Sequence, residues 1–541
     1  MDPEDIDFEL FPYQRKHVNT LELILRTKRA ALDSSDTGSG KTFSSCVLAR
    51  RLNMDIFVIG PKAVIENWFD VGAAIGVNVL GVTNYESAKN GKFYKLKDEF
   101  FAEERYNCPY VKNVTDAEGN TDYAWNLPPN TLLIFDEGHR GKNYTTKTSK
   151  LMDSASKIFE PVDGIPSTCK ILILSATITD SIDNFRVPAF LLDLSQWGKH
   201  AYKTWLRTLK VARGETQADH IHKLIFGAPG NPDPPTKCGS RMRIRDIQAD
   251  EDEIVRALFR GNDVRAQTYD MSPEVEMEIE AAYAEIDDAL RELREKGTSD
   301  NILTRILRAR QKIEMLKVPT MYMLAMKYVM QGQSVAIFVN FNATADALFV
   351  RLDPFIQDEY QSFITFINGG QSPDDRRYNI NSFRDDKSRI MLANIRAGGV
   401  GLSLHDVHGN FPRVALISPT WSSIELKQVL GRMRRAGAKS DTIQRIIYCK
   451  GRTRNEVAGK LQEAVDAGAA VVVGGNLDGP PRMNEREDIK AIEKQIADDT
   501  TFKCEGRGKV GVEELIAASV NKKMHTIEWL NNGDDNDLQL I

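Results

Sequence analysis

The chain has 541 residues, of which 42% are hydrophobic and 27% are charged, and its formal net charge is −5. This composition is typical of globular proteins and excludes a chain that is disordered throughout. The length allows about three or four domains, and the negative charge means that any nucleic-acid-binding surface must gather its basic residues locally.

The start of the chain and its cysteines favour an intracellular protein. The acidic residues 1–5 do not resemble a signal peptide, and no uncharged apolar run approaches the ~18 residues that a membrane span needs. The six cysteines form no C-x-x-C pair, which predicts reduced thiols rather than a zinc site or a disulfide framework. We expect no membrane partner.

In residues 1–230, short apolar runs alternate with longer amphipathic stretches. The runs are rich in branched residues, as buried parallel strands are, and the stretches between them predict helices. We therefore expect an α/β lobe here, with an insertion at about 86–130 that is either a nucleic-acid-facing element or a plain surface excursion. The predicted strands are 30–32, 56–59, 77–82, 132–135 and 171–174.

The alternating pattern stops in the middle of the chain. Four prolines in 227–237 cannot lie inside a regular element. A charged helical segment follows at 273–296, and it either bridges two lobes or lies as a solvated helix on one of them. We interpret 231–320 as a linker and helical bridge.

A second α/β lobe is predicted at 321–470, followed by a short tail appendage at 471–541. Its predicted parallel strands are 335–339, 363–367, 390–393, 414–417 and 442–448.

Residues 35–42 read Ser-Asp-Thr-Gly-Ser-Gly-Lys-Thr and lie between a predicted strand and a predicted helix. Glycines in this place let backbone N–H groups approach phosphate oxygens at the start of a helix. Lys41 would bind the β- and γ-phosphates of a nucleotide, and Thr42 would bind Mg²⁺. The strict pattern has Gly where this chain has Ser35. The predicted nucleotide contacts are Thr37, Gly38, Ser39, Gly40, Lys41 and Thr42.

Asp136 and Glu137 follow the apolar run 132–135. Two acids at the end of a buried strand are costly unless they bind a metal or take part in catalysis. Asp136 would hold Mg²⁺, and Glu137 would orient and deprotonate the attacking water. A lone Asp-Glu pair is more often an acidic turn, but the phosphate loop upstream favours the catalytic interpretation.

Arg432 and Arg435 lie three residues apart in a predicted helix, and hence on one face. Arginine suits a γ-phosphate because its planar fork donates two hydrogen bonds and keeps its charge. We predict that both act as arginine fingers from the second lobe. A solvated arginine-rich face is the alternative.

These motifs together resemble the superfamily 2 helicase-type ATPases, and within them the Swi/Snf-like branch. The sequence of residues 395–406 is most similar to that of the short Swi/Snf-like proteins encoded by large DNA viruses and phages. The resemblance covers roughly residues 8–455. The segments that carry it are 11–14, 60–62 with Asn67 and Trp68, 136–140, 399–404 and 428–437.

The resemblance implies two RecA-like lobes of the P-loop NTPase class that bind ATP and Mg²⁺ between them. Gln14 would read the adenine, and Gly399, Gly401 and Gln428 would complete the nucleotide site from the second lobe. Trp68 is either a stacking platform or, more often for such a residue, part of the core. The nucleic acid would contact Pro61, Lys62 and Trp68 in the first lobe and Asn340, Phe341 and Arg396 in the second.

Two departures leave the branch open. Residues 36–40 differ from the usual Swi/Snf-like phosphate loop. The motif Ser175-Ala176-Thr177 resembles that of strand-separating helicases. We expect a DNA-stimulated ATPase that translocates on duplex DNA. The alternatives are a strand-separating DNA or RNA helicase, for instance in viral transcription, and a non-enzymatic scaffold, which the filled catalytic positions disfavour.

The partners expected from this resemblance are duplex DNA, with RNA as the alternative, and a recruiting protein. The expected location is the cytoplasm or nucleus of a host cell, or a virion that packages the protein.

Overall fold

The computed structural model describes residues 10–449, apart from 98–99, 102–103, 116–118, 143–145, 162, 180, 210–215, 228–236, 297–299, 399–401 and 421. These residues form two compact units. The first comprises 10–259 with Arg435–Gly437, and the second comprises Arg260–Arg434 with 438–449. The predicted tail at 471–541 lies outside the described residues.

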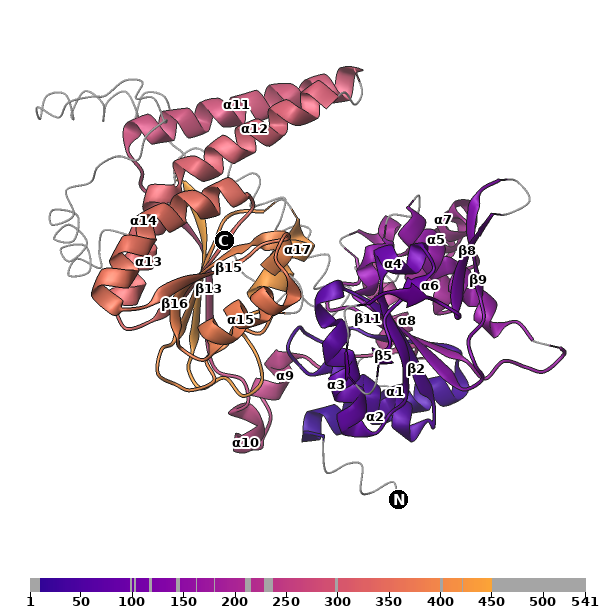
Figure 1. Ribbon diagram of the computed structural model, residues 1–541. Coiled ribbons are helices and arrows are strands. Elements are labelled where there is room, and N and C mark those ends of the chain that lie inside the picture. The colour runs from indigo at the N-terminus through magenta and orange to yellow at the C-terminus, as the bar shows by residue number, and fades with distance from the viewer. Residues whose placement is uncertain are drawn as a thin grey trace, which may run out of the picture. The chain divides into compact units, whose positions relative to one another are not determined.

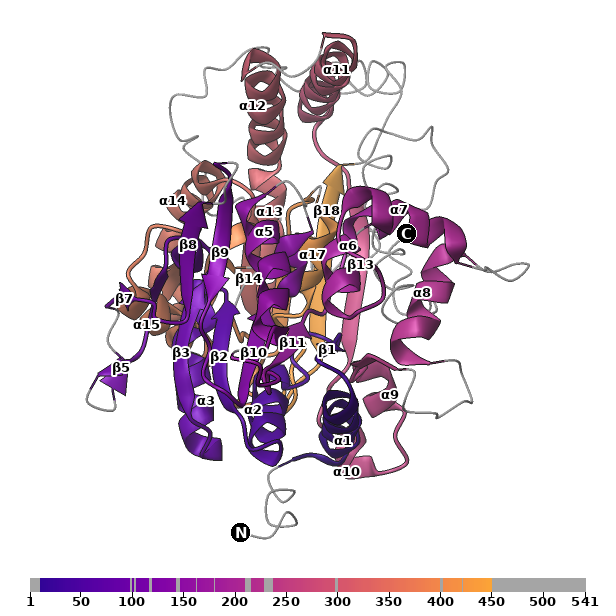
Figure 2. The same ribbon diagram turned by 90° about the vertical axis from the view of Figure 1, so that its right-hand side faces the viewer.

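The first unit is built on six parallel strands in the order β12-β1-β11-β10-β2-β3, which Figure 2 shows from the side. Successive residues of a strand point to opposite faces, so Phe57 and Ile59 pack in one core while Ile56 and Val58 pack in the other. The bounds are Ala30–Asp33 (β1), Asp55–Gly60 (β2), Val79–Asn84 (β3), Thr131–Asp136 (β10), Lys170–Leu174 (β11) and Gly239–Ser240 (β12).

Different helices cover the two faces of this sheet. Helices α1 (Pro12–Thr27), α2 (Lys41–Arg51) and α3 (Ile65–Ile75) bury their apolar residues in one core. The other core holds residues of α5 (Lys147–Ser154), α6 (Arg186–Leu191), α7 (Lys199–Thr208) and α8 (Gln217–Phe226). Two short helices, α9 (Ile244–Gln248) and α10 (Glu253–Arg256), follow β12.

The insertion between β3 and β10 is made of α4 (Tyr85–Lys89) and three antiparallel strand pairs. It packs on the first unit, because Phe93 and Tyr123 are buried in its core and the Trp125 indole donates to Ser154 Oγ at 2.9 Å. The pairs are β4 (Lys92–Phe93) with β7 (Tyr106–Asn107), β5 (Leu96–Lys97) with β6 (Phe100–Phe101), and β8 (Val111–Thr115) with β9 (Thr121–Trp125).

The second unit has a second six-stranded parallel sheet, in the order β13-β18-β17-β14-β16-β15. Helices α13 (Val318–Met330) and α14 (Asn342–Tyr360) share a core with it, while α15 (Pro373–Arg384), α16 (Ile395–Gly398) and α17 (Ser423–Leu430) connect its strands. The strands are Asn262–Tyr269 (β13), Ser334–Val339 (β14), Phe363–Ile367 (β15), Ser388–Asn394 (β16), Arg413–Ile417 (β17) and Thr442–Cys449 (β18).

The charged helix α11 has its predicted bounds, Pro273–Lys296, and lies beside α12 (Asp300–Leu316) as a helical hairpin of the second unit (Figure 1). Ile279, Ile286, Ala309 and Ile313 form the apolar contact within the hairpin. The segment that we interpreted as a linker, 231–320, is divided between the units. β12 extends the first sheet at its edge, and β13 and the hairpin belong to the second unit.

These two parallel α/β sheets confirm the predicted fold class. Cys46, Cys108, Cys169 and Cys238 are buried free thiols. A search of the described helices finds none that is both long and apolar enough to cross a membrane.

Candidate nucleotide and nucleic-acid sites

The loop between β1 and α2 has the backbone of a phosphate loop. Gly38 and Gly40 have φ angles of 92° and 96°, a region that residues with a side chain rarely adopt. Gly40 also lies under Gln14, where a Cβ atom would come within 2.3 Å of the amide nitrogen Nε2. The glycines are therefore required by the loop conformation and by the close packing of α1.

Gln14 and Tyr13 of α1 hold this loop through hydrogen bonds to the Ser39 carbonyl oxygen. Gln14 is buried, donates from Nε2 to the Ser39 carbonyl oxygen at 3.1 Å and accepts from the Phe11 N–H at 3.1 Å. The Tyr13 hydroxyl donates to the same carbonyl at 3.4 Å. The predicted adenine-reading residue thus anchors the phosphate loop, and its contact with the base stays a prediction.

Lys41 is the first residue of α2, and Thr42 follows it in the first turn. The Lys41 ammonium donates to the carbonyl oxygens of Ser35 at 2.9 Å and Asp36 at 3.2 Å. It therefore lies over the loop at the N-terminus of a helix, where backbone N–H groups and the helix dipole favour an anion.

Residues 242–244, which the sequence did not indicate as part of the site, hydrogen-bond to the loop. Ser35 Oγ accepts from the Met242 N–H at 2.8 Å, and Asp36 Oδ2 accepts from the Ile244 N–H at 2.8 Å. Ser35 therefore has a bonding role where the strict motif has Gly. Met242 and Ile244 contribute only backbone groups, which leave no side-chain pattern in the sequence.

Asp136 ends β10 and is held by two donors from other elements. The Trp68 indole donates to Asp136 Oδ2 at 3.2 Å, and the Tyr85 hydroxyl donates to its backbone oxygen at 2.9 Å. Gly60 allows this approach, because a Cβ there would lie 3.0 Å from Asp136 Cβ. Trp68 is fully buried, so the core interpretation is confirmed and the stacking-platform alternative is wrong.

Opposing electrostatic effects act on the Asp136 carboxylate. Burial and the neighbouring Glu137 raise the pKa of Asp136, whereas Lys41 and the Trp68 hydrogen bond lower it. A ligand for a divalent cation must be ionised, so Lys41 and Trp68 act in favour of metal binding by Asp136.

Glu137 has a left-handed backbone, with φ at 55° and ψ at 49°, a conformation that is costly outside glycine and often found at active sites. His139 Nδ1 lies 3.2 Å from Glu137 Oε2, 3.2 Å from Ser175 Oγ and 3.3 Å from Thr177 Oγ1. This imidazole joins Glu137, the predicted general base, to the Ser-Ala-Thr segment that follows β11.

The predicted nucleic-acid residues of the first unit lie after β2. Pro61 is buried and precedes a short 3₁₀ helix, Lys62–Val64, while Lys62 is exposed. Lys62 borders a surface hollow of about 340 Å³, which residues of the insertion complete. The other residues that line it are Asn84, Glu86, Ser87, Asn90, Tyr94 and Arg105.

The prediction that Arg432 and Arg435 lie on one helix face is wrong. Helix α17 ends at Leu430, and residues 431–433 form a turn, so Arg432 and Arg435 do not share a helix face. Gly431 is a poor helix former, and the Arg432 N–H closes the turn on the Val429 carbonyl. Arg432 is buried and donates to the Leu402 carbonyl oxygen at 3.3 Å.

Three further predictions concern the nucleotide site. Gln428 is buried on α17. Arg435 is grouped with the first unit, and Arg432 with the second. Since each unit is described by itself, the finger role of both arginines stays a prediction. Gly399 and Gly401 lie outside the described residues.

The predicted nucleic-acid residues of the second unit follow strand ends. Asn340 and Phe341 come directly after β14, and the Asn340 amide nitrogen is engaged by Glu314 at 2.6 Å and by the Pro419 carbonyl at 3.0 Å. Arg396 lies on α16, after β16, with an 83% exposed side chain whose Nε is 3.4 Å from Glu425 Oε1. The phosphate contact of Arg396 stays a prediction, and the Asn340 side chain is used within the protein.

Comparison with known proteins identifies the family. Residues 7–180 match the family "Type III restriction enzyme, res subunit", and residues 317–437 match the family "Helicase conserved C-terminal domain". A protein of Acanthamoeba polyphaga mimivirus that is named as an ATP-dependent RNA helicase is 36% identical over 452 residues, covering 81% of this chain and 79% of the relative. The chain belongs to the superfamily 2 helicases. It is related to viral members, as the motifs indicated.

A more distant relative of the helicase is CHROMATIN REMODELING 24 of Arabidopsis thaliana, which is 22% identical over 507 residues, covering 82% of the helicase and 44% of the relative. Two solved structures are similar in fold: the SWI2/SNF2 ATPase core of Sulfolobus solfataricus with dsDNA (13% identity, TM-score 0.31, covering 94% of the helicase and 99% of that chain) and S. cerevisiae Dbp5 with RNA and ADP BeF3 (10%, TM-score 0.41, covering 91% and 99%). At these scores neither bears on function.

Membership of this family makes the helicase an ATP-hydrolysing enzyme and an ATP-dependent nucleic-acid motor. The chemistry of the first unit fits the nucleotide, because Lys41 and the start of α2 lie together at the glycine loop. The Thr42 hydroxyl and the Asp136 carboxylate are the oxygen ligands that Mg²⁺ accepts alongside phosphate oxygens and water.

Proposed function

We propose that the helicase translocates on duplex DNA and grips the phosphate backbone. The observation that carries this proposal is the burial of Trp68 against Asp136. It removes the aromatic candidate of the first unit from the nucleic-acid side and leaves Lys62 and Arg105 beside the hollow, together with Glu86, which pairs with Lys89. Single-strand binders add exposed aromatic platforms to their phosphate contacts, whereas binders of a duplex hold it mainly through phosphate and sugar contacts.

We further propose that Thr42 and Asp136 hold Mg²⁺ with the ATP phosphates. When bound, the ion would neutralise charge on the β- and γ-phosphates. Trp68 would keep Asp136 in position through Oδ2, and Glu137 would take a proton from the attacking water. Arg432 and Arg435 would supply positive charge when the units close on the nucleotide.

A strand-separating RNA helicase is the second candidate. The mimivirus relative bears such a name, and the His139 imidazole contacts the Ser175 and Thr177 hydroxyls. The imidazole thus links Glu137, the proposed general base, to a segment whose sequence, Ser175-Ala176-Thr177, resembles that of strand-separating helicases.

Two assays on the full chain separate the candidates. The first follows displacement of a third strand from a DNA triplex, and the second follows unwinding of tailed DNA and RNA duplexes. Triplex displacement without unwinding would support the translocase. Unwinding of tailed RNA without triplex displacement would overturn it, and Lys41→Ala should be inactive in both assays.

A further inference from the structure

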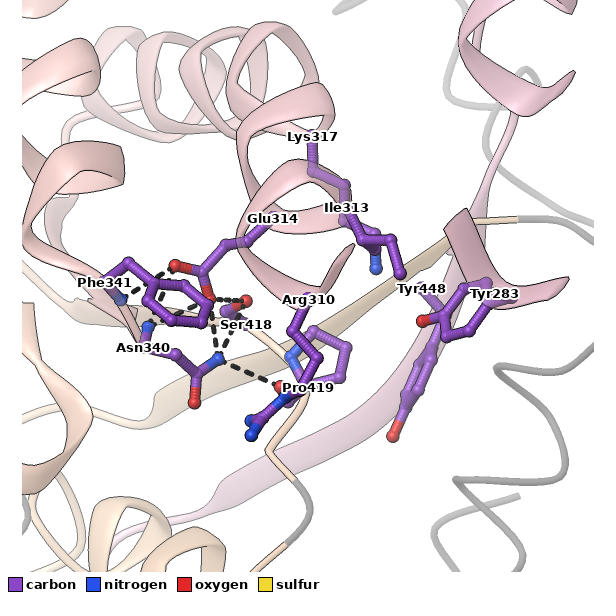
Figure 3. Close-up of a pocket in the computed structure, with 10 residues that line it drawn as sticks. All are labelled: Tyr283, Arg310, Ile313, Glu314, Lys317, Asn340, Phe341, Ser418, Pro419 and Tyr448. Carbon is purple, nitrogen blue, oxygen red and sulfur yellow. Dashed lines mark hydrogen bonds between the residues drawn. The ribbon is translucent and has the colours of Figure 1, made fainter. Parts of the chain in front are cut away.

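A small pocket in the second unit lies where α12 meets the carboxyl ends of β14 and β17. Figure 3 shows Arg310, Glu314 and Lys317 reaching toward it from the α12 side. Asn340 and Phe341 line it after β14, and Ser418 and Pro419 after β17. Tyr283 and Tyr448 complete the wall. Helix α12 belongs to the hairpin, so this pocket joins the hairpin to the sheet edge.

Glu314 fixes the floor of the pocket. Its side chain is buried, and its oxygens accept from the backbone N–H groups of Asn340 and Phe341 at 2.9 to 3.0 Å. The Asn340 amide nitrogen donates to Glu314 at 2.6 Å, and the Ser418 hydroxyl donates to Glu314 at 2.5 Å. A buried carboxylate is tolerated only with such donors. These donors come from the two loops, after β14 and after β17, that line the pocket.

Charge and size favour an anionic oxygen in the pocket. Arg310 and Lys317 line the pocket with two positive charges and Glu314 with one negative charge. The Lys317 ammonium is buried and donates to the Ile447 carbonyl oxygen at 3.4 Å, which leaves Arg310 as the cation that can meet a ligand. The cavity volume of about 30 Å³ admits one or two water-sized groups and is too small for a nucleobase. In Figure 3, the Arg310 guanidinium extends past Pro419 on the side of the Asn340 carboxamide.

Arg310 and Arg396 face a common region. Burial and the positive charge of Arg396 lower the pKa of Arg310, whereas the carboxylates of Glu314 and Glu425 raise it. Arg396 Nε lies 3.4 Å from Glu425 Oε1, so Glu425 lies near both guanidinium groups. The positive charges of Arg310, Lys317 and Arg396 still outnumber the two carboxylates by one, which favours a further anion at this edge. Arginine is well suited to this role because its fork matches the oxygens of a phosphate.

We propose that Arg310 binds a phosphodiester group of the nucleic-acid backbone at this pocket, next to Arg396. Glu314 acts as a positioning residue that holds the loops after β14 and β17. This inference rests on the proposed nucleic-acid binding of the helicase. It adds a phosphate contact on the helical hairpin, a region that the motifs do not reach.

The test measures binding of the full chain, without ATP, to fluorescein-labelled duplex DNA, single-stranded DNA and RNA over a range of salt concentrations. Arg310→Ala should weaken binding by about tenfold, since a charge-assisted hydrogen bond is lost. It should also reduce the slope of log K against log salt by about one. Arg310→Gln, which keeps the bulk and loses the charge, should reduce the slope likewise.

Arg308→Ala is the matched control, because Arg308 is an exposed arginine of the same helix that does not line the pocket. Thermal unfolding of each variant shows that it is folded. If the Arg310 variants bind with the affinity and salt slope of Arg308→Ala, the phosphate contact is wrong while the proposed function stands. If the unmodified helicase binds none of the three nucleic acids, the proposed function itself fails.

Discussion

The two sheets differ in the polar residue at the carboxyl end of a central strand and in the groups that hold it. β10 ends in Asp136, whose carboxylate accepts from the neutral indole of Trp68. β14 is followed by Asn340, whose N–H groups donate to the carboxylate of Glu314. In the first unit the indole holds a carboxylate that we propose as a ligand of Mg²⁺. In the second unit the carboxylate of Glu314 itself accepts the hydrogen bonds that hold the two loops.

This contrast shows how one architecture supports two tasks. Both units have six parallel strands flanked by helices, and the difference lies in a few strand-end side chains and the groups that hold them. We assign hydrolysis to the edge with Asp136 and Glu137, and the grip on nucleic acid in part to the edge with Arg310 and Arg396. The following changes, from the largest expected effect to the smallest, test this division.

Glu137→Gln should reduce turnover by up to about 10⁴-fold, because the amide cannot accept a proton from water. Binding of ATP and of nucleic acid should persist, since the amide keeps the size of the side chain. The measurement is steady-state phosphate release together with equilibrium binding of a fluorescent ATP analogue. Near-normal release by the purified variant would contradict the catalytic role.

Arg435→Ala should reduce turnover by about 10³-fold and change ATP affinity only a few-fold, because a late-arriving cation acts mainly on the transition state. Single-turnover hydrolysis and analogue binding check both quantities. Arg434→Ala removes the adjacent arginine and serves as the control. An unchanged rate in Arg435→Ala would mean that this segment does not complete the hydrolytic site.

Trp68→Phe should weaken Mg²⁺ binding by about tenfold, because a group that orients a metal ligand is lost while most of the packing remains. The readout is the Mg²⁺ dependence of ATP-analogue binding, which does not require turnover. Trp205→Phe makes the same exchange in α7 of the same unit. Equal Mg²⁺ dependence in both variants would show that the indole is only part of the core.

Asp153→Asn tests a buried carboxylate of the first unit that has no proposed catalytic role. Burial raises the pKa of Asp153 from 3.8 to about 7, so the native state binds this proton more tightly than the unfolded chain. Stability from this site is present at low pH and is lost as pH rises toward 7. The variant should therefore melt several degrees above the unmodified protein at pH 8 and match it near pH 4.

Asp183→Asn, an exchange at an exposed position of the same unit, should leave the melting temperature unchanged at both pH values. If Asp153→Asn gives the same small difference at pH 4 and pH 8, the carboxylate does not ionise at a cost in the folded protein.

The sequence predicted the sheets and the phosphate loop because both have strong local signals. Buried strands are apolar runs, and the loop needs Gly38 and Gly40 for its backbone. Strand β13 was missed because Asn262–Tyr269 is mostly polar and contains no apolar run, and β12 because it has only two residues. The continuation of a helix through Gly431 was wrong.

The remaining site residues depend on contacts between distant segments. Glu314 is one acid among many in the charged helical region, and nothing local distinguishes a buried carboxylate from a solvated one. The brace on Ser35 and Asp36 uses backbone N–H groups of residues more than 200 positions away. Localisation, a recruiting protein and the tail at 471–541 stay predictions.

The most direct test of the central claim is phosphate release by the full chain with duplex DNA, single-stranded DNA, RNA or no nucleic acid, with Lys41→Ala as the control. We predict release that depends on Lys41 and rises strongly with duplex DNA. Release that no nucleic acid stimulates, or that survives in Lys41→Ala, would contradict a motor driven from this phosphate loop.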